Sequence, residues 1–239
     1  MDAEQDLNIM ENIEKVNERI HRAAKSGGRN CNDISLIAVT KQKSAAMIKT
    51  LAENGIKKIG ESYLQEAVFK IDLLKDLDIE WHMIGNIQRG KEKQIANRFH
   101  VVHSVGTRRT AQELNRYAAA NNKILPVYLE INVSGEITKH GWQIQDLNSL
   151  EKFQPDIEEI VDFSNINVLG LMTMAPYSTE PEKARPYFQR LRKIRDTLVK
   201  LMPSAGITAL SMGMSGDFEV AIEEGATAVR IGSALVGPK

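Results

Sequence analysis

The chain has 239 residues, 42% of them hydrophobic, and its 31 basic and 31 acidic side chains cancel to no net charge. This length can bury one sizeable core, and the balanced charge argues against nucleic acid or an anionic membrane as a partner. No apolar run approaches the roughly 20 residues that cross a membrane. The single cysteine and the acidic start, without a secretory signal pattern, lead us to expect a cytoplasmic protein.

Helical and strand patterns alternate along the whole chain. The first is an amphipathic helix over residues 4–26, predicted by apolar residues at helical spacing: Leu7, Met10, Ile13, Val16 and Ile20. After a glycine-containing break, strands are predicted near 34–39, 56–60, 80–84, 99–104, 125–133, 166–172, 207–211 and 227–231. Helices are predicted near 44–53, 62–76, 88–97, 108–121, 143–162, 181–201 and 215–224, with a short last helix from Ser233.

This alternation predicts a (β/α)₈ barrel, an α/β fold of the TIM-barrel type. The runs 34–39 and 168–174 are apolar almost throughout, as expected for parallel strands covered on both faces. A doubly wound open sheet is the alternative, but its first turn is glycine-rich and Thr40-Lys41-Gln42 is not. No linker or internal repeat divides the chain, so we expect a single domain over residues 1–239.

Lys41 stands at the end of the first strongly apolar run, where a predicted barrel strand reaches its C-terminal end. Barrel active sites form at these ends, and an unprotonated lysine amine attacks a carbonyl to form an imine. The alternative is a lysine that only reaches solvent from the strand end, as we expect for Lys43 and Lys49. Lys139, in the loop-like stretch 135–142, is the second candidate for an imine.

Two turns of small residues follow the last two predicted strands. Ser215-Gly216 and Gly232-Ser233 combine hydroxyls with glycines, which let the backbone N–H groups approach an anion. A phosphate site near the last strands is frequent in this barrel, although Ser215 and Ser233 could simply cap helices. A lysine for an aldehyde and turns for a phosphate together predict a site for pyridoxal 5′-phosphate (PLP).

Arg230 is expected to share this site as a donor to a pyridine nitrogen or a phosphate. A donor that stays protonated leaves the ring nitrogen unprotonated and weakens the ring as an electron sink. The alternative for Arg230 is a salt bridge to Glu223 or Glu224 at the barrel rim. His82 and His103 are placed at the ends of strands three and four, as proton carriers or as buried structural histidines. No carboxylate or cysteine lies at ligand spacing beside them, so we expect no metal site.

Six short segments carry a resemblance to a known family. In chain order they are Ala38-Val39-Thr40-Lys41, Ile59-Gly60-Glu61-Ser62-Tyr63-Leu64-Gln65-Glu66, Trp81-His82-Met83-Ile84-Gly85-Asn86-Ile87-Gln88, Gly170-Leu171-Met172-Thr173-Met174, Leu210-Ser211-Met212-Gly213-Met214-Ser215 and Val229-Arg230-Ile231-Gly232-Ser233. Over residues 34–237 the chain resembles the YggS/PROSC family of pyridoxal phosphate homeostasis proteins. The resemblance implies a barrel like the N-terminal domain of alanine racemase, with PLP held as a Schiff base on Lys41. The cofactor-binding residues that it implies are Lys41, Arg230, Gly232 and Ser233, with Ser211 or Ser215 at the phosphate.

The resemblance also implies a carrier or regulator of PLP supply, with PLP-dependent apo-enzymes as possible recipients, rather than an enzyme. A racemase with this barrel needs a second acid–base group, which in alanine racemase comes from a C-terminal β domain. This chain ends soon after its eighth predicted strand, so we expect a fold-type III barrel without that domain. The apolar positions of the N-terminal helix could pack on the barrel or on another subunit, and we expect a monomer. The alternatives are a weak amino-acid racemase that uses Tyr63, His82 or His103, and a class I aldolase whose Lys41 binds a sugar phosphate.

Two positions depart from the family pattern. Ser62 stands where asparagine is common, which questions a side-chain contact to the cofactor there. Gly106 stands where an acidic residue is frequent, shortly after the His-Ser pair of the fourth strand. We expect the second change to alter the rim of the barrel without touching PLP binding.

Overall fold

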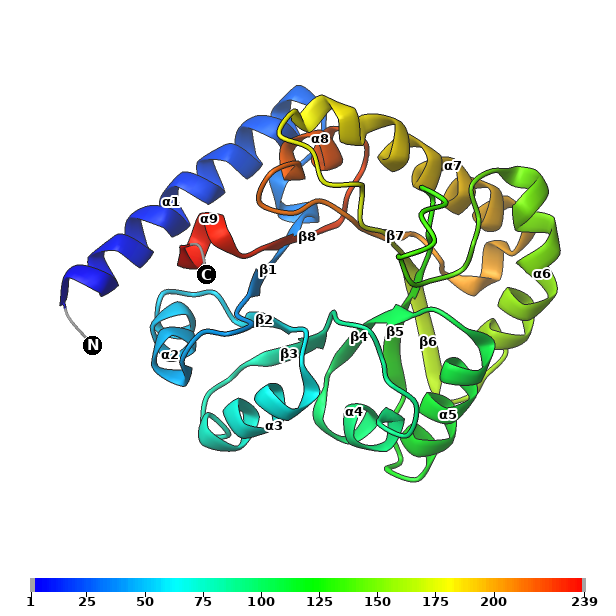
Figure 1. The fold of residues 1–239 in the computed structure, drawn as a ribbon, viewed down its shortest axis with the longest axis horizontal. Helices are drawn as coiled ribbons and strands as arrows, with labels where there is room; N and C mark the ends of the chain where they lie inside the picture. The colour runs from blue at the N-terminus through cyan, green and yellow to red at the C-terminus, as the bar shows by residue number, and fades with distance from the viewer. Residues whose placement is uncertain (1–2, 238–239) are drawn as a thin grey trace.

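A computed structural model describes residues 3–237 and contains a closed barrel of parallel strands (Figure 1). Each strand pairs with the next in the chain, and β8 closes the barrel on β1. The strands are β1 (Ser35–Val39), β2 (Lys58–Glu61), β3 (Glu80–Met83), β4 (Val101–Val105), β5 (Leu125–Glu130), β6 (Ile166–Met172), β7 (Ala209–Ser211) and β8 (Ala228–Ile231). The predicted TIM-barrel fold is confirmed. Residues 1–2 and 238–239, which belong to the predicted domain, lie outside the described residues.

Helices surround the barrel on its outer side (Figure 1). They are α1 (Ala3–Ser26), α2 (Ala45–Glu53), α3 (Leu64–Leu73), α4 (Glu92–Arg98), α5 (Arg108–Ala119), α6 (Leu147–Val161), α7 (Arg185–Leu201), α8 (Phe218–Glu223) and α9 (Ser233–Val236). Short 3₁₀ turns cover Cys31–Asp33, Pro181–Ala184 and Pro203–Ala205, so the helix predicted over 181–201 begins as a separate turn. Within residues 3–237 no helix is long and apolar enough to cross a membrane.

The N-terminal helix α1 lies along α8 and α9, outside the barrel (Figure 1). Arg19 pairs with Glu219 of α8 at 2.7 Å, and the Asn12 amide donates to the Leu235 carbonyl of α9 at 3.1 Å. The buried apolar face of the helix consists of Ile9, Ile13, Val16 and Ile20. Met10, predicted on this face, is half exposed, and the Leu7 side chain lies outside the described residues. The helix therefore buries its apolar stripe on its own chain.

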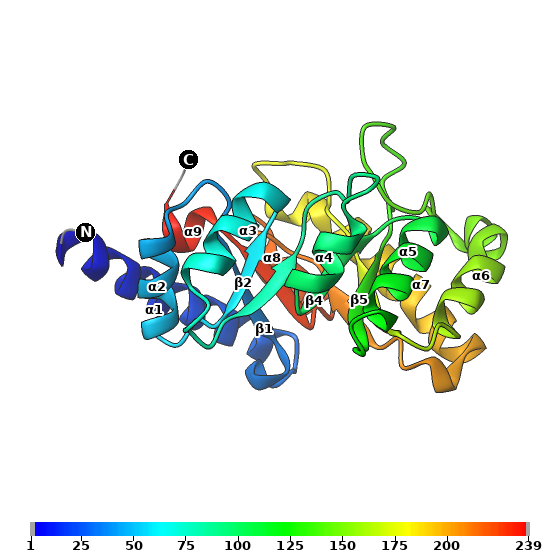
Figure 2. The ribbon, with the colours of Figure 1, turned by 90° about the horizontal axis from the view of Figure 1, so that it is seen from below.

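The two-residue period of a strand decides which side chains enter the barrel. Val229 and Ile231 of β8 pack in the main core, between the strands and the helices. Arg230, between them in the chain, points into the barrel and donates to Ser211 of β7. The C-terminal ends of the strands lie at the end of the barrel at which the loops after β5 and β6 rise (Figure 2).

Candidate functional site

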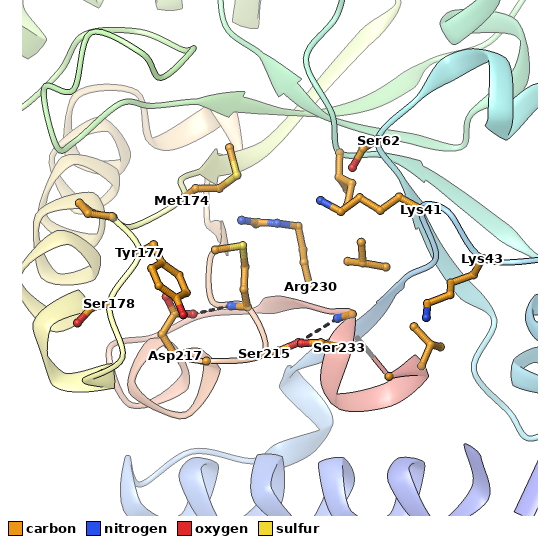
Figure 3. Close-up of a pocket in the computed structure, with 18 residues that line it drawn as sticks. Lys41, Lys43, Ser62, Met174, Tyr177, Ser178, Ser215, Asp217, Arg230 and Ser233 are labelled. Carbon is orange, nitrogen blue, oxygen red and sulfur yellow. Dashed lines mark hydrogen bonds between the residues drawn. The ribbon is translucent and has the colours of Figure 1, made fainter. Parts of the chain in front are cut away.

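A cavity of about 360 Å³ lies at the C-terminal ends of the strands, beside α9 (Figure 3). Several elements contribute one or more residues to its lining: Lys41 follows β1, Ser62 follows β2, Met174 follows β6, Ser215 follows β7 and Arg230 belongs to β8. This is the end of a (β/α)₈ barrel at which functional sites form. Its volume falls in the range of small-molecule sites.

Five of the six residues predicted to bind a cofactor line this one cavity: Lys41, Ser215, Arg230, Gly232 and Ser233. Ser211, the sixth, is fully buried and is not part of the lining. Its hydroxyl accepts a hydrogen bond from Arg230 Nη1 at 2.6 Å, which places it behind the arginine. Strand alternation explains this position, because Ser211 is the last residue of β7 and points inward.

Two other lysines lie near this assignment. Lys43, expected to reach solvent from the helix side, also lines the cavity. Lys139 does not line it; its ammonium contacts the Glu136 carboxylate and donates to the Met174 carbonyl at 3.2 Å. Figure 3 shows the Lys41 side chain extending from its turn toward the middle of the cavity, where Arg230 ends. The geometry therefore favours Lys41 as the amine of this site.

The charged lining is mainly cationic. Lys41, Lys43 and Arg230 face one carboxylate, that of Asp217. Asp217 Oδ1 accepts from the Met214 N–H at 2.6 Å, and burial raises the pKa of this carboxyl, while Arg230 opposes the rise. An excess of positive charge in a partly closed cavity attracts an anionic ligand.

The two small-residue turns form one wall. Ser215 Oγ accepts from the N–H groups of Gly232 at 3.1 Å and of Ala234 at 3.3 Å, so Ser215 does cap α9 (Figure 3). The backbone N–H groups of Ser215, Gly216 and Ser233 have no hydrogen-bond partner among residues 3–237. A Cβ at Gly216 would meet open space, so a ligand has access to this backbone. The wall thus offers backbone N–H donors that still lack an acceptor, and the oxygens of a phosphate can accept from them.

Arg230 is 4% exposed and is held from behind. Its Nη2 donates to the Thr173 carbonyl at 2.9 Å, in addition to the bond from Nη1 to Ser211. Burial lowers the pKa of Arg230 to about 10, which leaves the guanidinium charged at neutral pH. The alternative of a salt bridge at the rim is wrong. Glu223 and Glu224 instead pair with Arg185, at 2.6 and 2.9 Å.

A chain of hydrogen bonds continues from Arg230 through the interior of the barrel. Ser211 Oγ lies 2.9 Å from His103 Nδ1, and His103 Nε2 lies 2.9 Å from His82 Nδ1. The Ser211 hydroxyl has a hydrogen and a second lone pair, so the tautomer of the imidazole sets the direction of its bond with His103 Nδ1. The same holds for the bond between His103 Nε2 and His82 Nδ1. The remaining ring nitrogen of His82, Nε2, lies 2.8 Å from a Glu80 carboxylate oxygen at the start of β3.

Burial, followed by the charges of His82 and Arg230, lowers the pKa of His103 well below its usual range. The sequence placed both histidines at strand ends, but they lie within β3 and β4, beneath the cavity. Neither lines it, and Tyr63 lines a separate cavity of about 350 Å³. In the described part of the chain no cluster of three or more His, Cys, Asp or Glu residues could hold a metal ion.

Only one of the two departures from the family pattern lies in the lining of the cavity, because Gly106 is not part of it. Ser62 lines the cavity. A Cβ on Gly106 would lie 3.1 Å from the Gly141 backbone and 3.8 Å from Glu130 Oε2. Glu130 is itself buried, and burial raises its pKa to about 7 although Arg230 opposes the rise. This inward carboxylate was not predicted, although its place at the end of an apolar strand is a readable signal.

Comparison with known proteins defines the class of this barrel. The family model for the N-terminal domain of alanine racemase matches residues 8–239. The solved alanine racemase of Clostridium difficile in complex with cycloserine superposes with a TM-score of 0.74. That match covers 97% of this chain and 60% of the racemase at 16% identity, so it shows a similar fold and nothing more. The chain is a barrel of the alanine racemase N-terminal domain class.

Curated relatives narrow this class. The chain is 41% identical to the pyridoxal phosphate homeostasis protein of Aquifex aeolicus, over 98% of this chain and 99% of the relative. It is 42% identical to that of Pseudomonas aeruginosa, over 97% and 96%. The chain therefore belongs to the family of pyridoxal phosphate homeostasis proteins, as its sequence segments predicted. The structure of PipY from Synechococcus elongatus with PLP bound matches at 30% identity and a TM-score of 0.78, over 92% of this chain and 100% of PipY.

Proposed function

We propose that this protein binds PLP and holds it as a Schiff base on Lys41, serving PLP homeostasis without robust turnover of its own. One observation carries the proposal: a lysine amine, an arginine donor and backbone N–H groups that have no partner within residues 3–237 converge on a single cavity. The solved structure of PipY with PLP bound, a 30% identical protein, supports it. The donor set fits the molecule, since Ser215, Gly216 and Ser233 suit a phosphate and Lys41 suits an aldehyde.

The chemistry of the anchor belongs to Lys41. Lys41 would supply the unprotonated amine that condenses with the aldehyde, with the carbonyl oxygen released as water. PLP supplies the aldehyde and a conjugated ring that can accept electrons. Arg230 would donate to an acceptor of that ring and keep its own proton, because its pKa stays near 10. A ring nitrogen that remains unprotonated withdraws electrons weakly, which suits storage better than carbanion chemistry.

The same cavity argues for a carrier over the racemase alternative. Racemisation needs a second proton-transfer group that faces the ring from the side opposite the lysine. None of the three residues considered for that role, Tyr63, His82 and His103, lines the cavity. We therefore expect no α-proton exchange on alanine or serine, even at high protein concentration.

We further propose that one domain, residues 1–239, performs this role as a monomer in the cytoplasm. Monomer formation is supported by α1, whose apolar stripe is covered by α8 and α9 of the same chain. PLP-dependent apo-enzymes are the proposed recipients of the cofactor. With no net charge, the chain offers no general attraction for nucleic acid or a membrane surface.

The first test is the absorbance spectrum of the purified protein, followed by borohydride reduction and peptide mapping. We expect a visible band in the wild type, its loss in Lys41→Ala, and a reduced adduct on the peptide that contains Lys41. Lys43→Ala and Lys139→Ala are matched controls, because Lys43 lines the same cavity and Lys139 was the second candidate; both should retain the band. A protein that stays colourless with PLP would contradict the proposal and favour the aldolase alternative. An adduct on Lys139 would show that Lys41 is not the residue that binds the aldehyde.

A further inference from the structure

Lys70 of α3 is a buried lysine that does not line the cavity. It is 3% exposed and lies on the helix face shared with Leu64 and Ala67, which packs on the barrel. A buried ammonium is costly unless its three donors are satisfied. Here all three are: Nζ donates to the Thr40 carbonyl at 2.7 Å, to Glu61 Oε1 at 2.7 Å and to Glu66 Oε1 at 2.6 Å.

One of these contacts fixes the backbone immediately before Lys41. Thr40 and Glu61 point away from the cavity, toward α3, because they alternate with inward-facing neighbours. The Thr40 hydroxyl donates to the same Glu61 oxygen at 2.6 Å, and Lys70 binds both the Thr40 carbonyl and that oxygen. The last residue before the candidate anchor is therefore held through both its carbonyl and its side chain.

A second contact fixes the backbone immediately after Lys41. The Gln42 N–H donates to Glu66 Oε1 at 2.6 Å, the oxygen that also accepts from Lys70. Gln42 has a φ of +61°, a conformation that non-glycine residues adopt only where the surroundings hold them. The Lys70 ammonium thus holds both chain neighbours of Lys41, Thr40 directly and Gln42 through Glu66.

The ammonium is needed because the carboxylates around it are buried. Glu61 is 0% exposed, and burial raises its pKa although Lys70 and Thr40 donate to it. Its second oxygen has no hydrogen-bond partner within residues 3–237. Without Lys70, the Glu61 and Glu66 carboxylates would be left close together without their cation, a strongly unfavourable arrangement. The support of the turn is therefore an ionic cluster that depends on one residue.

We propose that Lys70 is a positioning residue for Lys41: through Glu61 and Glu66 it holds the turn 40–42 so that the Lys41 amine points into the cavity. Its own donors are all used, so Lys70 does not compete for an aldehyde. The effect on the Schiff base rests on the function proposed above, whereas the effect on the turn does not.

The test compares Lys70→Met with Lys58→Met. Lys58 is a half-buried lysine at the opposite end of β2, where it donates to Ser35 Oγ at 2.8 Å, away from the turn. In PLP-free protein we expect the Gln42 amide to exchange its hydrogen more than about tenfold faster in Lys70→Met and at the wild-type rate in Lys58→Met. With PLP, Schiff-base formation should slow about tenfold to hundredfold only in Lys70→Met, and the pH midpoint of the visible band should shift.

Glu66→Ala serves if Lys70→Met does not fold. The Glu66 side chain is 26% exposed, so its loss is tolerated more easily, and it removes the acceptor of the Gln42 amide. Wild-type Gln42 exchange in a folded variant would overturn the proposal, as would faster exchange with an unchanged Schiff-base rate. Absence of any Lys41 adduct in the wild type would refute the proposed function instead, and the exchange of Gln42 would still decide whether Lys70 holds the turn.

Discussion

Lys41 and Arg230 enter the same cavity from neighbouring strands but are supported in opposite ways. The turn of Lys41 is held from outside the barrel wall by a charged cluster of Lys70, Glu61 and Glu66. Arg230 is held from inside the barrel by two uncharged groups, the Ser211 hydroxyl and the Thr173 carbonyl, and the hydroxyl in turn contacts His103. One support fixes a backbone, and the other fixes a side-chain head group.

The difference follows from what each residue must keep available. An amine that is to attack an aldehyde must keep its lone pair available, and hydrogen bonds to the backbone of Thr40 and Gln42 hold the chain on either side of Lys41. An arginine that is to donate to a ligand can spend several donors on its own protein and still present others. In the centre of the barrel burial penalises charge, and the Arg230 cation is balanced mainly by Asp217 and Glu130.

Of the substitutions considered, removing the guanidinium of Arg230 should have the largest effect on PLP affinity. For Arg230→Gln we expect the dissociation constant for PLP to rise about 10- to 100-fold, because a hydrogen bond to a charged donor is worth about 1.5–3 kcal/mol. Absorbance titration with PLP measures this. Arg190→Gln is the control, since Arg190 donates to the Val133 carbonyl and does not line the cavity. Equal affinity in Arg230→Gln and the wild type would mean that the arginine does not touch the cofactor.

Glu130 tests the charge balance around Arg230. Its pKa of about 7 lies above the usual value for a glutamate, so between pH 4.5 and 7 the folded protein keeps a proton that the unfolded chain has lost. Stability should therefore fall as pH rises through this window, by up to about 3 kcal/mol. Glu130→Gln cannot lose that proton, so its gain in unfolding free energy over the wild type should grow from pH 4.5 to 7 and then level.

Urea denaturation at several pH values measures this difference. Glu151→Gln is the matched control, because Glu151 is exposed and its substitution should leave the pH profile unchanged. A gain for Glu130→Gln that is the same at pH 5 and pH 8 would show that the carboxyl ionises normally in the folded protein. In that case Arg230 would have a full negative charge nearby, and the interior would not be the nearly neutral support described above.

Local patterns were sufficient to predict the fold and one side of the site. Apolar runs bounded by polar turns marked every strand, and the small residues after β7 and β8 lie where a barrel would bring them together. Lys41, Ser215, Arg230, Gly232 and Ser233 could be predicted to converge because the C-terminal ends of all barrel strands meet at one end.

The supports behind these residues were not predicted, because they depend on tertiary packing. Lys70 reaches a carbonyl 30 positions earlier in the chain, which no spacing rule indicates. Its one readable signal is its place on the apolar face of α3, where a lysine needs acceptors. His82 and His103 were predicted at strand ends, but they lie within β3 and β4. Apolar runs locate a strand only to within a few residues, and a shift of one residue moves a strand side chain to the other face of the sheet.

Ser211 gives the smallest and most discriminating effect, because two roles for it make different predictions. As a support behind Arg230, its loss in Ser211→Ala leaves Arg230 Nη1 without its acceptor and His103 Nδ1 without its partner, so PLP affinity should fall only about 2- to 10-fold. The control is Ser35→Ala, which removes the acceptor of Lys58 at the far end of the barrel and should leave affinity unchanged. In combination with Arg230→Gln, Ser211→Ala should add little, since a support has no effect once the residue it holds is gone. If Ser211 instead bound the phosphate directly, as the family resemblance allowed, its loss would weaken PLP binding to the same degree with or without Arg230.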